Sequence, residues 1–337
     1  MHYNEAIKDF DTYVARNPKG VWNESAKYFR AKNNSYLNNN DLALAQLDGF
    51  IKEFPKSTYK DDAREVMAGI YAQQQNFEKA IEMFELYKKE NRSVFEQIAA
   101  ESRITQFAST LSRKELSKKD SLKYKYYDSI VTSFPQKITQ ILKDYPDSNP
   151  IQAQSLFSLY NYYHSIEKNL DKSIEILQSI LNNPQYLIEP PAQYTLNNCE
   201  NCDRGLLVKP WVEFNLALVY TEKGDFDKAE KYKNTMLKDN KSPLYWRLEL
   251  TKIETKYKNN TENNLAYFET SLKQISEIQN LDRTLRARAL FLLADIYSRE
   301  RKKNEARELY DKIVNNFANT IYAKVSNSIL KYYNMSK

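Results

Sequence analysis

The only two cysteines of the chain, Cys199 and Cys202, form a Cys-x-x-Cys pair. A structural zinc site needs four ligands, and a second pair of cysteines is absent. Redox pairs of the thioredoxin type begin a helix after a strand, and no strand is evident at this point. An exported protein would join the two thiols as a disulfide. We therefore expect a disulfide that braces the loop or two inert thiols, with a metal or redox role as the alternative.

Catalytic side chains are hard to find elsewhere. The two histidines are His2 and His164, and His164 follows two tyrosines on an expected helix, where a packing role explains it. The chain has no nucleophile motif, phosphate loop or metal-protease helix. The acidic pair Asp61 and Asp62 stands at an expected helix start, where the helix dipole favours it without any chemistry. We expect no catalytic residue, no metal and no cofactor, and a protein that is not an enzyme.

The composition points to helices. The 337 residues include five glycines, which are too few for the turns of a Rossmann fold or of a β-rich protein. The net charge of +6 arises from 50 basic and 44 acidic residues, a mixed surface, whereas nucleic-acid-binding domains cluster their basic residues more strongly. No run of about 18 apolar residues occurs, so no membrane-spanning helix is expected.

The first third of the chain repeats with a period of 37 residues. The interval recurs at Ala6, Ala43 and Ala80, and again at Phe10, Leu47 and Phe84. Pro18 and Pro55 keep the same interval, as do Ala26 and Ala63. A frame shifted by two residues also fits the second unit. Matches at this many positions indicate internal repeats.

One stretch, 212–239, shows what a repeat contains. Two amphipathic runs flank Gly224 and Asp225, since Gly224 can take the positive φ that ends a helix and Asp225 can cap the next one. Ala217 and Ala229 fall where two antiparallel helices would touch, and a larger side chain would push them apart. The stretch therefore predicts a helix-turn-helix hairpin built for stacking.

The sequence Leu216-Ala217-x-x-Tyr220, with Gly224-Asp225-Phe226 and Ala229, resembles the tetratricopeptide repeat (TPR), a family of roughly 34-residue hairpins. The resemblance implies an all-α, TPR-type superhelical solenoid of antiparallel helical hairpins. Two further stretches, 40–57 and 292–310, resemble bacterial envelope TPR proteins of the BamD and YbgF type. Similar repeats serve in secretion systems and in flagellar-motor accessory structures.

The pattern divides the chain into four parts. Residues 1–92 carry N-terminal hairpins, the first of them truncated, and 93–183 carry irregular helical repeats. A long loop with the Cys-x-x-Cys pair spans 184–209, and 210–337 hold C-terminal hairpins and a terminal helix over 320–335.

Individual helices are also expected from the periodicity. Residues 94–111 should form one helix, and Pro135 should split its partner into 118–133 and 135–145. A less typical pair of helices is expected at 244–258 and 262–279.

The resemblance also implies where partners bind, because the first helix of each TPR hairpin lines a concave groove. Carrying its groove positions onto two hairpins gives ten candidates: Trp211, Phe214, Leu218, Thr221, Glu222, Arg288, Phe291, Asp295, Ser298 and Arg299. Trp211 and Phe214 follow the long loop directly, so loop and groove could form one site. The alternative is that the loop folds back and buries both side chains.

Together these observations predict a non-enzymatic scaffold or adaptor that binds other proteins, namely components of a bacterial envelope or motor assembly. A periplasmic or envelope location is expected, with the cytoplasm as the alternative. The chain opens at His2 in what looks like the second helix of a hairpin, so we expect an earlier start that carries a signal or a lipid anchor. The functional alternatives are an RNA-binding helical repeat and a redox or metal role of the Cys-x-x-Cys loop.

Overall fold

The computed structural model describes residues 2–89, 93–116, 121–187, 208–233, 242–259 and 264–335. Every regular element in these ranges is helical, so the predicted all-α class is confirmed. The chain divides into two compact units, Met1–Glu167 and Lys168–Lys337. The four-part division expected from the sequence stays a prediction.

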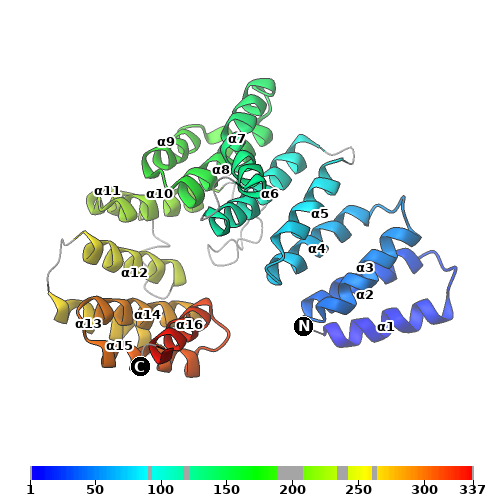
Figure 1. The fold of residues 1–337 in the computed structure, drawn as a ribbon. Helices are drawn as coiled ribbons and strands as arrows, with labels where there is room; N and C mark the ends of the chain where they lie inside the picture. Colours follow the sequence, from blue (N-terminus) through cyan, green and yellow to red (C-terminus); the bar gives the residue numbers. More distant parts are fainter. Residues whose placement is uncertain are drawn as a thin grey trace. The chain divides into compact units, whose positions relative to one another are not determined.

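Unit 1, Met1–Glu167, is built from eight α-helices and a π-helical segment in the described residues (Figure 1). In chain order these are α1 Tyr3–Arg16, α2 Asn23–Tyr36, α3 Asn40–Glu53, α4 Lys60–Gln73, α5 Phe77–Lys89, α6 Val94–Lys114, α7 Leu122–Asp144, α8 Asn149–Asn161 and the π-helical η2 Tyr162–Glu167.

Unit 2, Lys168–Lys337, begins with α9 and ends with a terminal helix in the described residues (Figure 1). Its elements are α9 Leu170–Leu181, the short 3₁₀ helix η3 Pro184–Tyr186, α10 Lys209–Lys223, α11 Phe226–Lys231, α12 Pro243–Lys258, α13 Leu265–Glu277, α14 Arg283–Arg299, α15 Lys303–Asn316 and α16 Ile321–Met335. The predicted terminal helix over 320–335 is confirmed by α16.

Neighbouring helices pair as hairpins, and alternate helices form a layer of their own. In unit 2, α14 packs on α15, and α15 packs on α16. The first helices of successive hairpins also touch, α10 with α12, α12 with α14, and α14 with α16. Unit 2 therefore presents one surface to which successive first helices contribute side by side, as stacked repeats require.

Small residues lie at the points where helices meet. Ala43 and Ala80 are fully buried at equivalent places in α3 and α5, and Ala217, Ala294 and Ala306 are fully buried in unit 2. Larger side chains then fill the spaces between helices, such as Leu47 and Phe50 in unit 1. Ala217 and Ala229, for which the sequence predicts such a contact, are both buried, and their helices α10 and α11 pack together.

The turns inside the hairpins contain a residue with a positive φ. Gly224 has φ +87°, and Asn38, Gln75 and Arg301 have φ of 60° to 62°, each just after the first helix of a hairpin; Lys168, which follows η2, has φ 61°. At Gly224 the next residue donates its N–H back to the Tyr220 carbonyl at 2.9 Å, which satisfies a carbonyl at the helix end. Asp225 then accepts the Lys228 N–H with its side chain at 3.2 Å, as predicted.

Pro135 does not split its helix, so the prediction of two pieces, 118–133 and 135–145, is wrong. Helix α7 runs without a break from Leu122 to Asp144. Proline removes one backbone hydrogen bond, but Tyr127, Phe134 and Ile138 lie on one face and are all buried. Burial of this face offsets the loss and keeps the helix continuous.

Other boundaries shift by a few residues. Helix α13 begins at Leu265 and ends at Glu277, inside the expected 262–279, because Asn264 caps it by accepting the Tyr267 N–H at 3.3 Å. Helix α6 covers the predicted 94–111 and continues to Lys114. Most of the predicted loop 184–209 lies outside the described residues. None of the described helices is both long and apolar enough to cross a bilayer.

Candidate functional site

A pocket of about 500 Å³ lies on the first-helix surface of unit 2. We call it the inner pocket. Four of the ten predicted groove residues line it: Leu218, Glu222, Arg288 and Phe291. The remaining lining residues are Arg247, Thr251, Glu254, Thr284, Leu285, Leu292 and Tyr322.

The packing of the first helices explains why these residues meet. The lining comes from α10, α12, α14 and α16, and from none of the second helices α11, α13 and α15. Side chains from these four helices converge because α10 packs on α12, α12 packs on α14, and α14 packs on α16. The site is therefore a product of repeat stacking, since no single hairpin could form it.

An aromatic pair forms the apolar wall of the inner pocket. The Phe291 ring lies 5.4 Å from the Tyr322 ring of α16 and 5.8 Å from the Tyr310 ring of α15. Burial raises the pKa of Tyr322, while Arg288 lowers it and Glu254 raises it, with a net rise. The Tyr322 hydroxyl therefore stays neutral at physiological pH. Leu285 and Leu292 are half-buried and extend this wall.

The polar wall holds one compensated arginine. Arg288 donates to the Glu254 carboxylate at 2.9 Å and to the Thr251 hydroxyl at 3.2 Å. Glu254 also accepts from Lys258 at 2.5 Å. Burial alone would raise the pKa of Glu254, but the hydrogen bonds from Lys258 and Arg288 outweigh it and leave the pKa lowered. The carboxylate is therefore charged, and it is shared between Arg288 and Lys258.

The second arginine of the pocket, Arg247, is exposed. Its guanidinium lies over the Phe214 ring, 5.7 Å from the ring centre. No carboxylate in the described part of the chain is within ion-pair distance of it. The inner pocket thus combines an apolar wall with a guanidinium that no described carboxylate pairs with, while Glu222 and Glu254 bring the formal charge of the lining to zero.

The other predicted groove residues lie outside the lining. Phe214 is 3% exposed and belongs to a core cluster with Ala217 and Leu248, against which the half-buried Trp211 packs. Asp295 and Arg299 form an ion pair at 3.0 Å along α14.

Two further candidates are also absent from the lining. Thr221 is buried and donates to the Ala217 carbonyl at 2.7 Å, and Ser298 lies near the end of α14. A role of these residues in partner binding stays a prediction.

The sequence does not predict the pocket residues of α12 and α16. The groove positions of the two typical hairpins do not include Arg247, Thr251 and Glu254, which lie in the less typical pair 244–279. They also do not include Tyr322, because a terminal helix is expected only to cover the end of the stack. The helical periodicity of 244–258 would have placed the α12 residues on the same surface.

Cys199 and Cys202 lie outside the described residues, so the predicted disulfide or inert pair stays a prediction. Within the residues that the structure describes, no group of three or more His, Cys, Asp or Glu side chains is arranged to hold a metal ion. The His164 ring stacks on Tyr160 with the ring centres 5.4 Å apart, which agrees with a packing role.

Comparison with protein families identifies the hairpins. Family models described as tetratricopeptide repeat match residues 288–320, over most of α14 and all of α15, and residues 214–233, over the later part of α10 and all of α11. The chain contains tetratricopeptide repeats. The match at 288–320 includes Arg288 and Phe291 of the inner pocket. The closer resemblance to BamD-like and YbgF-like envelope proteins stays a prediction, because the matched models describe the repeat in general.

The chain was also compared with curated protein sequences and with solved structures. No curated protein matches the chain in sequence. Among solved structures, the chain aligns with the TPR domain of P58(IPK) at 15% identity over 99% of this chain and 94% of that chain, with a TM-score of 0.27. A TM-score this low supports no structural conclusion.

Proposed function

We propose that this TPR protein is a non-enzymatic adaptor that binds a segment of a partner protein in the inner pocket. TPR hairpins are a scaffold for protein–protein interaction, and the inner pocket is the place where the first helices of unit 2 converge. That convergence is the observation that carries the proposal. A pocket of about 500 Å³ falls in the usual range for sites that enclose a ligand group.

The chemistry of the walls defines the partner segment. Phe291, Tyr322 and Leu285 offer an apolar surface for an aliphatic or aromatic anchor. Arg247 stands at the same pocket, and no carboxylate among the described residues lies within ion-pair distance of it. The partner segment therefore carries an apolar side chain close to an acidic one.

The test starts with crosslinking in cells and mass spectrometry to identify the partner, followed by its affinity for purified variants. Arg247→Glu should weaken binding by about tenfold or more, because it replaces attraction by repulsion. Glu308→Lys reverses an exposed charge on α15, outside the pocket, and should leave the affinity unchanged. Equal affinities for the wild type and Arg247→Glu would refute binding at this pocket.

We further propose that the partner belongs to a bacterial envelope assembly, of the outer-membrane assembly, secretion or flagellar-motor accessory type. The resemblance of 40–57 and 292–310 to envelope TPR proteins supports this assignment. Fractionation of cells producing the protein from its natural gene should recover it with the periplasm or the envelope. Recovery in the cytoplasmic fraction alone would refute the location and leave the adaptor role standing.

A further inference from the structure

Helix α1 is less covered than the equivalent helix α3. An interval of 37 residues places Ala6 and Phe10 of α1 where Ala43 and Leu47 stand in α3. Helix α3 packs on both α2 and α4, and these two side chains are fully buried. Among the described helices, α1 packs chiefly on α2, and none of its residues is buried to that extent. One side of α1 therefore lacks the cover that α2 gives to α3.

Trp22 lies on the same uncovered side. It directly precedes α2, as Tyr59 directly precedes α4 after the same interval of 37 residues. The Tyr59 ring stacks on the Tyr28 ring of α2, with the ring centres 4.8 Å apart. Trp22 is 67% exposed, because no described helix takes the place that α2 has beside Tyr59. We call the surface of Ala6, Asp9, Phe10 and Trp22 the α1 face.

The α1 face also carries a carboxylate. Asp9 stands 37 residues before Gln46 of α3. Gln46 accepts a hydrogen bond from the Asn34 amide of α2 at 3.0 Å, so this position points toward the covering helix. Asp9 is exposed and forms no ion pair with a described residue. A helix that covers α1 should therefore bring a donor or a cation to Asp9.

Helix α16 exposes an apolar stripe. Ile321, Val325 and Tyr332 are 60%, 39% and 74% exposed, and their spacing of four and seven residues places them on one helical face. The opposite face packs on α14 and α15 and buries Ala323 and Leu330 in the core. The outer face of a terminal helix that stays in water is usually polar, so the stripe indicates a contact surface.

Helix α14 shows what covers such a stripe inside the stack. An offset of 36 residues places the buried Ala287 of α14 on the buried Ala323 of α16. The same offset places Ala289 on Val325. Ala289 is fully buried, and α15 packs on α14 as the second helix of its hairpin. Among the described residues, no second helix packs on α16 in this way. The stripe is therefore the surface on which a second helix fits.

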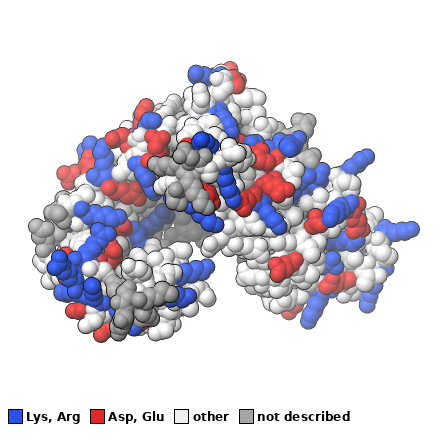
Figure 2. All heavy atoms as spheres, viewed as in Figure 1, with Lys and Arg blue, Asp and Glu red and all other residues white. Residues whose placement is uncertain are grey.

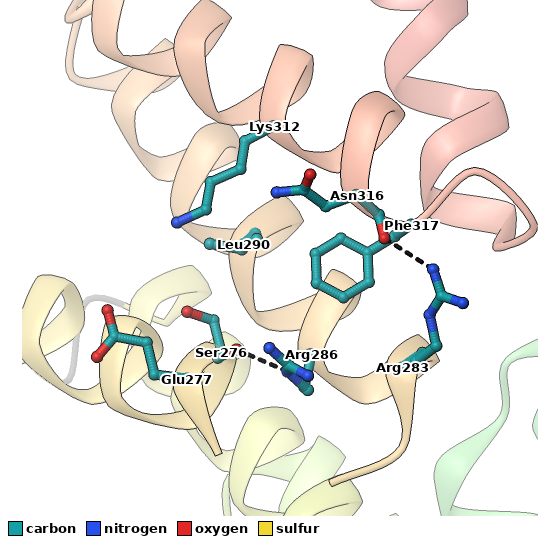
Figure 3. Close-up of a pocket in the computed structure, with 8 residues that line it drawn as sticks. All are labelled: Ser276, Glu277, Arg283, Arg286, Leu290, Lys312, Asn316 and Phe317. Atoms are coloured by element: carbon teal, nitrogen blue, oxygen red, sulfur yellow. Dashed lines mark hydrogen bonds between the residues drawn. The ribbon is translucent and has the colours of Figure 1, made fainter. Parts of the chain in front are cut away.

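Helix α16 is firmly held at its start. Arg283 of α14 donates to the Asn316 carbonyl at the end of α15 at 2.8 Å (Figure 3). Phe317 and Thr320 in the connection to α16 are both buried. The Thr320 hydroxyl accepts the Ala323 N–H at 3.2 Å in the first turn of α16. The stripe is therefore oriented before any partner arrives, which lowers the entropy that binding must overcome.

The charges of the two surfaces are opposite. Residues 321–335 of α16 include two lysines and no acidic residue, a formal charge of +2. Residues 3–16 of α1 include three acidic and two basic residues, a formal charge of −1. Lys324 and Lys331 are exposed beside the stripe, and neither forms an ion pair with a described residue. They are cations of the kind that Asp9 requires.

We propose that α16 of one copy of this chain packs on the α1 face of a second copy. Helix α16 is a first helix with the surface for a second helix exposed, and α1 is a second helix with the surface for a first helix exposed. Together they complete a hairpin. Because the two surfaces differ, the contact is head-to-tail and can continue from copy to copy. It is independent of partner binding at the inner pocket.

The test is sedimentation velocity of the purified 337-residue chain over a range of concentrations. The sedimentation coefficient should rise with concentration. Trp22→Glu and Val325→Glu should each raise the dissociation constant about tenfold or more, because each places a charge in an apolar contact. Both side chains are exposed, so the helical content measured by circular dichroism should not change. A wild-type chain that stays monomeric at every concentration would overturn the proposal and leave the two surfaces to other proteins.

Mixing the two variants tests the geometry of the contact. Trp22→Glu keeps an intact α16, and Val325→Glu keeps an intact α1 face. An equimolar mixture should therefore form a dimer and nothing larger. Leu122→Glu makes the same kind of change at an exposed residue of α7, which packs on α6 and α8, and should leave association unchanged. The proposal is wrong if the mixture stays monomeric or if Leu122→Glu also abolishes association.

Charge reversal tests the role of Asp9. Asp9→Lys should raise the dissociation constant about fivefold, the upper end for exposed charge pairs. Asp48→Lys makes the same charge change at an exposed residue of α3 and should have no effect. Equal weakening by both variants would show that overall charge drives association, which contradicts a specific contact at the α1 face.

Discussion

At the residue scale, the hairpin turns depend on single residues with a positive φ. Gln75 has φ +60°, and the Asn76 N–H after it bonds back to the Tyr71 carbonyl at 2.8 Å. A left-handed conformation costs a residue with a side chain about 1 to 2 kcal/mol, which glycine avoids. Glycine loses about 0.5 to 1 kcal/mol more conformational entropy on folding, so the substitution still gains stability.

We therefore predict that Gln75→Gly raises the free energy of unfolding by about 0.5 to 1 kcal/mol. Gln73→Gly is the matched control, because Gln73 is the same exposed residue type two positions earlier, in the last turn of α4. It should lower stability by up to about 1 kcal/mol. Urea unfolding followed by circular dichroism measures both. Opposite signs support the account, and destabilisation by Gln75→Gly would contradict it.

Gly224 carries the clearest residue signal for a positive φ, and Asp225 carries the signal for the next helix start. Asn38 carries a weaker signal, because asparagine tolerates this region. Gln75 and Arg301 adopt φ of 60° and 62° although their residue types do not favour it. These turns form because the packing of the two helices fixes both ends of the turn. That packing does not constrain the residue type at the turn position, so the sequence does not reveal it.

At the scale of elements, the distance between helices depends on alanine. Ala43 of α3 is fully buried, while Ala45 on the same helix is exposed. We predict that Ala43→Leu lowers the free energy of unfolding by about 3 kcal/mol, because the added atoms have no space between the helices. Ala45→Leu should change it by less than about 0.5 kcal/mol. Thermal unfolding of the two variants compares them directly, and equal losses would contradict the packing account.

A buried carboxylate joins three helices of unit 1. Glu101 of α6 accepts hydrogen bonds from Lys88 of α5 and Lys137 of α7. Burial alone would raise the pKa of Glu101, but the bonds from Lys137 and Lys88 outweigh it and leave the pKa lowered. The stability that Glu101 contributes is therefore complete at neutral pH and is lost as the pH falls below its ordinary value of 4.5 and through the folded-state pKa.

We predict that Glu101→Gln lowers the free energy of unfolding by about 2 kcal/mol at pH 7, less than for a fully buried pair because both lysines are partly exposed. The difference from the wild type should shrink as the pH falls below about 4.5 and through the lowered pKa of Glu101, where its carboxylate becomes protonated. Glu82→Gln, on the exposed side of α5, serves as control and should change stability little. A pH-independent difference would contradict the ionic role of Glu101.

The helix boundaries agree with those expected from the sequence, except where tertiary packing outweighs a local sequence signal. Pro135 predicted a break in α7, yet the buried face of Tyr127, Phe134 and Ile138 keeps the helix whole. The π-helical segment Tyr162–Glu167 after α8 was not predictable, since one added residue per turn changes the periodicity by too little to detect in six residues.

At the scale of the whole molecule, charge gives a second indication of the partner class. Lys and Arg residues alternate with Asp and Glu over the face shown in Figure 2. A nucleic-acid partner would need a contiguous basic stripe for its phosphates. The mixed surface instead suits a protein partner, for which local complementarity fixes the register of binding.

The candidate site was predictable in part. Family positions located Leu218, Glu222, Arg288 and Phe291, because each lies on a first helix with clear TPR periodicity. They could not show that α12 and α16 complete the pocket, since that depends on how four helices pack in space. The family positions also assigned Trp211 and Phe214 to the groove, but Phe214 lies in a buried core cluster and Trp211 packs against that cluster.

The central claim is that the inner pocket contacts a partner protein, and site-specific photocrosslinking tests it most directly. A photoreactive phenylalanine analogue is placed at Arg247, at the inner pocket, or at Glu308, on the exposed side of α15. After irradiation of living cells, the account predicts one discrete crosslinked protein from position 247 and none from position 308. Crosslinks of equal yield at both positions, or only at position 308, would contradict it.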